Sequence, residues 1–214
     1  SARSTAGAMS WLEDSKVLEK WTSTHAGLTG QEAAQEVPAA LFVDAAKAII
    51  SLFDLISGMG IVKSDMLNNA EVLKGKLVAG KEDITLQMLV NDELASGDVS
   101  KLAKDGKTAT CALLWLTRAL LFIRELLAQM TAHPEAKLSD CIYKGYEKTL
   151  REFHGFAVRT TFSIALKAAP TRQTLITKLG PSEPEVMSAL TAVLDKYTTV
   201  LQVNSSFLVA KGIK

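Results

Sequence analysis

Two polar residues four positions apart are the first candidates for a binding site. Asp65 and Asn69 share one face of a predicted helix that begins after the glycines at positions 58 and 60. A carboxylate and an amide at this fixed separation supply the acceptors and donors that hold sugar hydroxyls or an amide group. A solvated helix face, with Asp65 in a first turn favoured by the helix dipole, fits the spacing equally well. The spacing alone leaves both interpretations open.

A second candidate lies in an almost wholly apolar segment, residues 108–124, which carries one Trp and one internal Arg. At helical spacing Trp115 and Arg118 share a face with Cys111 and Phe122, and the next face is apolar as well. A helix that is apolar nearly all round belongs in the middle of a bundle. We therefore expect Trp115 and Arg118 inside or at the mouth of a cleft. The alternative is a core Trp with a paired structural Arg.

The third candidate is His154, one polar ring on the apolar face of a helical pattern that spans residues 138–169. A lone His of this kind is usually a core residue with satisfied hydrogen bonds. Gly155 follows it, and a glycine inside a helix costs about 1 kcal/mol relative to alanine. We therefore expect another group, either a backbone neighbour or a ligand, to approach closely at this point.

The elements that must position these residues are all predicted helices. Apolar residues recur at helical spacing in the segments 11–21, 41–56, 61–78, 84–94, 99–130, 138–169, 171–179 and 186–209. Glycines and prolines separate the segments, and no stretch alternates as a strand would. The sequence predicts an all-α fold, a single-domain two-layer helical bundle over residues 11–214. Residues 1–10 are predicted to be a tail or a remnant of cloning.

The composition excludes several functions. The chain has 214 residues, 48% of them hydrophobic, and a net charge of +1. Because Lys and Arg are scattered rather than clustered, we expect no binding to nucleic acid. Two cysteines make neither a disulfide framework nor a zinc site, so we expect a reduced, cytoplasmic compartment and no metal. We also expect no cofactor, no signal peptide and no membrane-spanning segment, since arginines interrupt the longest apolar stretch.

With these motifs in view, the sequence resembles the glycolipid transfer protein family over roughly residues 42–179. The matching pieces follow the family's order: LFDLISGMG (52–60), KSDMLNN (63–69), ALLWLTRALLFI (112–123), FHGFAV (153–158) and AAP (168–170). The resemblance implies a two-layer all-α fold in which a surface centre that recognises sugar and amide opens onto an apolar tunnel. It also implies a monomeric lipid carrier that binds a glycosphingolipid, meets a membrane transiently and is not an enzyme.

The resemblance also implies a role for each candidate residue. Asp65 and Asn69 match the family's acidic and amide headgroup ligands, and Trp115 matches the Trp on which the first sugar stacks. His154 matches the His that bonds the lipid amide, and Arg118 is expected to support the headgroup site beside an acidic neighbour. Phe156 is expected to contact the membrane. The expected tunnel lining is apolar and consists of Phe53, Val62, Phe122, Val158, Phe162, Ala165 and Leu166.

Two positions depart from the glycolipid-binding pattern. The family carries Lys seven residues after the Asp, where this chain has Val72, and Lys74 lies on another face of the helix. One sugar contact is therefore expected to be missing. The family's membrane-contacting Trp is Phe156 here, which keeps apolar insertion but lacks an indole N–H suited to the interface, so weaker docking is expected.

The sequence also bears on three alternative functions. Members that carry ceramide-1-phosphate use two Arg in the places of Cys111 and Trp115 and a basic residue in the place of Asn69. This chain has none of the three, and a phosphate desolvated without partners costs several kcal/mol, so a neutral sugar headgroup is favoured. A lipid sensor with the same ligand stays open. A lipid hydrolase using Asp65 and His154 lacks any nucleophile motif.

Overall fold

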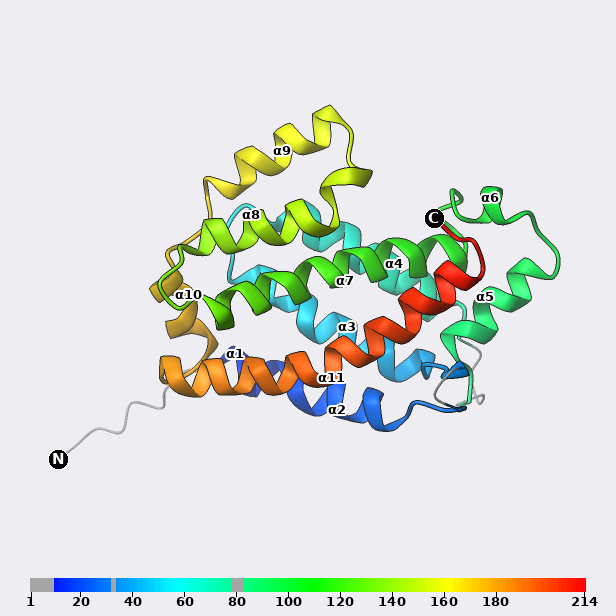
Figure 1. Cartoon of the computed structure of the whole chain (residues 1–214), viewed down its shortest axis with the longest axis horizontal. Coiled ribbons are helices and arrows are strands. Elements are labelled where there is room, and N and C mark those ends of the chain that lie inside the picture. The colour runs from blue at the N-terminus through cyan, green and yellow to red at the C-terminus, as the bar shows by residue number, and fades with distance from the viewer. Residues whose placement is uncertain (1–9, 32–33, 78–82) are drawn as a thin grey trace.

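The computed structural model describes residues 10–31, 34–77 and 83–214, and every regular element in these ranges is a helix (Figure 1). The prediction of an all-α single domain is confirmed. Short 3₁₀ helices occupy Ser51–Asp54 and Arg151–Phe153. The α-helices are α1 (Trp11–Ser15), α2 (Val17–Ala26), α3 (Ala39–Ile50), α4 (Gly60–Gly75), α5 (Leu86–Leu94), α6 (Val99–Leu102), α7 (Ala109–Ala132), α8 (Leu138–Thr149), α9 (Phe156–Leu166), α10 (Arg172–Leu179) and α11 (Glu183–Ala210).

The helices pack in two layers. One layer contains α4, α7 and α8, and the other contains α3, α2 and α11 (Figure 1). Helix α7 contacts α4, α8, α5 and α11, so it lies in the middle of the molecule. Its sequence explains this position, because an apolar surface nearly all round must be buried on several sides. Sixteen residues of α7 are buried, as the sequence predicts.

A carboxylate from another helix holds the beginning of α7. Both carboxylate oxygens of Glu93, in α5, accept hydrogen bonds from the backbone N–H groups of Ala109 and Thr110, at 2.7 and 2.9 Å. The Thr110 hydroxyl donates to the same carboxylate, and Lys76 pairs with it at 3.1 Å. An anion at a helix N-terminus satisfies free N–H groups and complements the helix dipole. Glu93 therefore fixes where the central helix begins.

The core between the layers is aromatic at its centre. Trp21 is fully buried and meets the rings of Phe42 and Tyr197 with centroids 6.0 and 4.4 Å apart. The Tyr197 hydroxyl donates to the backbone carbonyl of Leu120 at 2.7 Å, which connects α11 to α7. Removing any of these rings would leave a large cavity, which costs about 3–5 kcal/mol.

Helix α8 packs closely on α7 because a glycine faces the contact. A Cβ added to Gly145 would lie 3.1 Å from the backbone nitrogen of Leu126. Helix α9 differs from its neighbours, because Phe162 is its only residue that is buried. In Figure 1 α9 stands away from the rest of the bundle, on the side of α8. The described residues contain no helix both long and apolar enough to cross a bilayer.

Two predicted helices are in fact broken. The segment 99–130 divides into α6 and α7, and the Thr108 hydroxyl caps α7 by accepting from the N–H of Cys111 at 3.1 Å. The segment 138–169 divides into α8 and α9, and His154 between them has extended backbone, with φ −99° and ψ 129°. The helical spacing of apolar residues continues across each break, so this spacing alone cannot show where one helix ends and the next begins.

This break corrects the prediction made for Gly155. The residue is the N-cap of α9 rather than a position inside a helix, and a Cβ there would meet nothing within 4 Å. The expected approach of a backbone neighbour at Gly155 is therefore wrong, and the approach of a ligand stays a prediction. At the other end of the chain, Ser10 caps α1, and its hydroxyl donates to the Glu13 carboxylate at 3.0 Å. Residues 1–9 of the predicted tail lie outside the described residues.

Candidate functional site

Two rings from different parts of the chain face each other at the predicted site. Trp115 in α7 and His154 before α9 lie nearly parallel, with ring centroids 6.4 Å apart and an interplanar angle of 18°. Both side chains are half-buried, so part of each remains accessible. The expectation that Trp115 lies at the mouth of a cleft stays a prediction. An exposed indole face suits the C–H face of a sugar.

Arg118 has an aromatic partner that the sequence did not indicate. Its guanidinium carbon lies 3.6 Å from the ring centroid of Phe153 and 4.9 Å from that of Trp115. Burial lowers the pKa of Arg118, and the charge of Glu152 opposes that effect. Among the described residues Arg118 forms no ion pair within 4.0 Å. Its contacts hold Phe153 and Trp115 in place, since a cation over an aromatic face is worth about 0.5–2 kcal/mol.

Asp65 offers a carboxylate that is free to bind a ligand. It is exposed on α4, and among the described residues neither carboxylate oxygen accepts a hydrogen bond. Partial burial raises the pKa of Asp65, while the nearby His154 lowers it. Asn69 donates from its amide to the backbone carbonyl of Asp65 at 2.9 Å. This bond fixes the Asn69 side chain beside Asp65 and leaves its amide oxygen as an acceptor.

His154 is held on the side opposite the solvent. Its Nδ1 lies 3.1 Å from the hydroxyl of Tyr146, in α8. Burial lowers the pKa of His154, the Asp65 carboxylate raises it, and Arg159 lowers it. The imidazole is therefore mainly neutral at pH 7, and the structure leaves its Nε2 for a ligand. Asp65 and His154 lie near enough for each to affect the pKa of the other, and their joint role in binding an amide stays a prediction.

Three of the predicted tunnel residues form one aromatic cluster beneath the site. Phe53 and Phe122 are stacked with centroids 5.9 Å apart, and Phe162 meets Phe122 edge to face at 6.0 Å. Phe122 follows Trp115 by seven residues on α7, so the cluster lies about 10 Å along the helix from the indole.

The other predicted tunnel residues are less buried. Val62, Ala165 and Leu166 are partly buried and pack against the core. Val158 is 48% exposed on the outer side of α9 and does not belong to the aromatic cluster. The tunnel lining stays a prediction, and for Val158 it would require α9 to move when a lipid enters.

Comparison with known proteins identifies the family. Residues 37–181 match the family model described as glycolipid transfer protein (GLTP). The chain belongs to the glycolipid transfer protein family. The glycolipid transfer protein of Aureobasidium melanogenum is 31% identical over 176 residues, which cover 81% of this chain and 84% of that protein. HET-C2, a fungal glycolipid transfer protein, has a crystal structure that is 31% identical, with a TM-score of 0.77, covering 92% of this chain and 99% of that one.

Membership of the glycolipid transfer protein family settles the fold and the broad activity. The members are lipid carriers and not enzymes, so this chain is a lipid transfer protein. The fold does not choose the headgroup. The crystal structure of mouse ceramide-1-phosphate transfer protein superposes with a TM-score of 0.83 at 17% identity, over 96% of this chain and 98% of that one. A likeness at this identity shows the fold alone.

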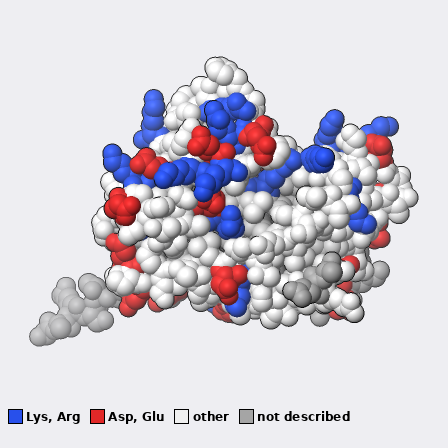
Figure 2. Space-filling view, viewed as in Figure 1, with Lys and Arg blue, Asp and Glu red and all other residues white. Residues whose placement is uncertain are grey.

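Two large apolar side chains of this family member are exposed at the beginnings of α9 and α4. Phe156, at the start of α9, is 86% exposed, and Ile61, at the start of α4, is 73% exposed. In Figure 2 charged side chains of both signs lie over the flank of α8 and α9, while the top of the view, where α9 begins, is uncharged. A contiguous apolar patch marks an interaction surface, whereas single exposed apolar side chains are common. The membrane contact of Phe156 stays a prediction.

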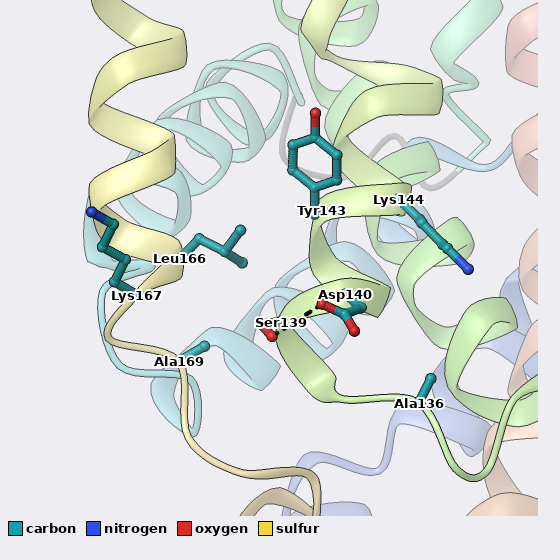
Figure 3. Close-up of a pocket in the computed structure, with 8 residues that line it drawn as sticks. All are labelled: Ala136, Ser139, Asp140, Tyr143, Lys144, Leu166, Lys167 and Ala169. Atoms are coloured by element: carbon teal, nitrogen blue, oxygen red, sulfur yellow. Dashed lines mark hydrogen bonds between the residues drawn. The ribbon is translucent and has the colours of Figure 1, made fainter.

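A hollow of about 620 Å³ lies between α8 and α9 of this family member, and sequence reasoning did not foresee it. Leu166 points into it from α9, and Tyr143 stands on the α8 side (Figure 3). Sequence reasoning also missed two residues of the site itself, Tyr146 and Phe153. Both precede His154 by a few positions, but only the break before α9 brings them around it.

Proposed function

We propose that this member of the glycolipid transfer protein family binds a glycosphingolipid and transfers it between membranes inside the cell. The sugar lies on Trp115, its hydroxyls bond to Asp65 and Asn69, and the lipid amide lies between Asp65 and His154. The two hydrocarbon chains enter the apolar interior beside Phe122. The single observation that carries this proposal is that His154 lies 6.4 Å from Trp115 between ring centroids and is near enough to Asp65 to lower the pKa of its carboxyl.

The charge of the site supports a neutral headgroup. A phosphate monoester needs a fork of cationic donors. Arg118 is the cation beside Trp115, and its guanidinium already lies on the Phe153 ring. Cys111 and Trp115 are not basic, and the free carboxylate of Asp65 faces the same region. A phosphate would therefore lack a cationic fork at Cys111 and Trp115, whereas sugar hydroxyls can bond to a carboxylate and an amide at once.

The exposed apolar surface supports a membrane step. A carrier must take the lipid from a bilayer, and Phe156 and Ile61 are large side chains that can enter its interface. The free, buried cysteines fit a reducing compartment, so we place the transfer in the cytoplasm. We also propose that the carrier acts as a monomer.

A transfer assay between vesicles that offers glucosylceramide and ceramide-1-phosphate together tests the headgroup. The native protein should transfer glucosylceramide and hardly any of the phosphorylated lipid, and the opposite preference would overturn the proposal. Trp115→Ala and Asp65→Val should each abolish most transfer while far-UV circular dichroism stays native. Asp44→Val is the matched control, because Asp44 is exposed on α3 away from the site. Full transfer by both site variants would remove the site assignment.

A further inference from the structure

Tyr146 lies between the candidate headgroup site and the apolar interior. It is 2% exposed, and its ring stacks on that of Phe162 with centroids 3.8 Å apart and an interplanar angle of 14°. Its hydroxyl lies 3.1 Å from Nδ1 of His154. The ring therefore belongs to the aromatic cluster, while the hydroxyl belongs to the polar site. Neither the family resemblance nor the sequence pattern gave Tyr146 any part in the site.

The surroundings of the Tyr146 phenol determine which group donates in its hydrogen bond with His154. A buried hydroxyl needs an acceptor, and among the described residues Nδ1 of His154 is the only hydrogen-bond partner of the Tyr146 hydroxyl. Burial raises the pKa of Tyr146, so the phenol keeps its proton. If Nδ1 carried the imidazole proton, the phenol O–H would have no acceptor at all, which costs about 1–3 kcal/mol. The favoured arrangement has bare Nδ1 as acceptor and the imidazole proton on Nε2.

We propose that Tyr146 is a positioning residue that holds His154 in the tautomer with its proton on Nε2. His154 then presents a fixed hydrogen-bond donor to the site, beside the Asp65 carboxylate, which is a fixed acceptor. One donor and one acceptor side by side match an amide, which offers C=O and N–H in a set order. This step rests on the proposed function, because the amide is that of the bound sphingolipid. A ligand with an ester in place of the amide lacks the N–H that Asp65 would accept.

The tautomer can be measured without any lipid. The chain has three histidines, so long-range ¹H–¹⁵N spectra of the imidazoles are simple, and a His154→Gln variant assigns the resonances. At pH 7.5 the native protein should show His154 with a proton on Nε2 and a hydrogen-bonded, unprotonated Nδ1. In Tyr146→Phe the Nδ1 resonance should move to the value of an unbonded nitrogen and the two tautomers should mix. Tyr143→Phe, which removes an exposed hydroxyl from the same helix, should leave the spectrum unchanged.

A measurement on the native protein covers the case in which Tyr146→Phe does not fold. The Tyr146 hydroxyl proton should exchange slowly with solvent and show a nuclear Overhauser effect to the His154 ring. Absence of that effect, a proton on Nδ1 in the native protein, or an unchanged Nδ1 resonance in Tyr146→Phe would each overturn the inference.

A binding experiment with glucosylceramide tests the functional consequence. Tyr146→Phe should weaken binding about fivefold, the equivalent of one net hydrogen bond of about 1 kcal/mol, and Tyr143→Phe should not weaken it. In a His154→Gln background Tyr146→Phe should have no further effect, whereas a merely structural role would weaken binding in both backgrounds. Equal binding by Tyr146→Phe and the native protein would overturn the inference. Failure of the native protein to bind glucosylceramide would instead overturn the proposed function.

Discussion

Gly58 lies against the backbone carbonyl of Ala165, so closely that a Cβ on Gly58 would be nearer to that oxygen than 3.0 Å. Gly58 precedes α4, which carries Asp65 and Asn69, and Ala165 is near the end of α9. Gly58 also has φ +87°, a left-handed conformation that favours glycine. This contact ties the far end of α9 to the headgroup-binding helix, although α9 packs loosely elsewhere.

The first prediction follows from that contact. Gly58→Ala should push α9 away from the bundle and strain the backbone, lowering the free energy of unfolding by about 1–3 kcal/mol and reducing glycolipid transfer. Chemical denaturation and a vesicle transfer assay measure the two effects. Gly60→Ala is the control, because a Cβ at Gly60 meets nothing within 4 Å and its φ is not positive. Equal stability of the two variants would contradict the role given to Gly58.

The second prediction concerns the cap that Glu93 gives to α7. Burial raises the pKa of Glu93, but the hydrogen bonds from Thr110 and Ala109, with Lys76, lower it overall. A carboxyl group whose pKa is lowered on folding stabilises the protein above its unfolded pKa of about 4.3, and that stability is lost as the pH falls through the folded value. Glu93→Gln should therefore cost about 1–2 kcal/mol at pH 7 and progressively less below pH 4.

Thermal unfolding of Glu93→Gln and the native protein between pH 3 and pH 7 checks this pH dependence of stability. Glu19→Gln is a suitable control, since Glu19 is exposed on α2 and forms no ion pair among the described residues. A difference between native and Glu93→Gln that stays constant with pH would show that the charge of Glu93 is unimportant to the cap.

The third prediction separates binding from stability at Asp65. Partial burial raises the pKa of the Asp65 carboxyl, so the ionised carboxylate lowers the stability of the folded protein at neutral pH. Asp65→Asn removes the charge and should keep or slightly raise the melting temperature at pH 7 while glycolipid binding falls at least tenfold. As the pH falls through the Asp65 pKa, the native protein becomes protonated there and its melting temperature should approach that of the variant. A variant that melts well below the native protein at pH 7 would contradict this account.

The sequence predicted the position of some residues correctly and of others wrongly. The apolar surface of residues 108–124 predicted a central helix, because burial on several sides is a local property of that sequence. The helical spacing of Asp65 and Asn69 placed them on one face for the same reason. His154 was placed wrongly inside a helix, because the apolar period runs on through the break at residues 150–155. Its contact with Tyr146 depends on how that break turns the chain, and the ring beneath Arg118 depends on it as well.

The fourth prediction tests the lining of the interior. Ala165 is partly buried on α9 and packs against the core, whereas its neighbour Ile164 is 63% exposed. Ala165→Phe should fill part of the space for a hydrocarbon chain and shift the preferred acyl chain to a shorter one. Ile164→Phe adds an aromatic ring at an adjacent position that faces outward, so its chain-length profile should stay native. Native mass spectrometry after exposure to glucosylceramides of mixed chain length reports both profiles, and identical profiles would argue against a lining by Ala165.

The last prediction concerns Val72, where the glycolipid-binding pattern of the family has a lysine. Val72 is half-buried, three residues after Asn69 on α4, so a longer side chain can run along the apolar surface with its head toward the sugar. Val72→Lys should strengthen glucosylceramide binding by about 1 kcal/mol for one hydrogen bond from a charged donor. Val72→Met adds length without a donor and should not strengthen it. Calorimetric titration with short-chain glucosylceramide and lactosylceramide checks both variants. The native protein should favour neither lipid strongly, and a large native preference for the two-sugar lipid would show that another donor replaces the lysine.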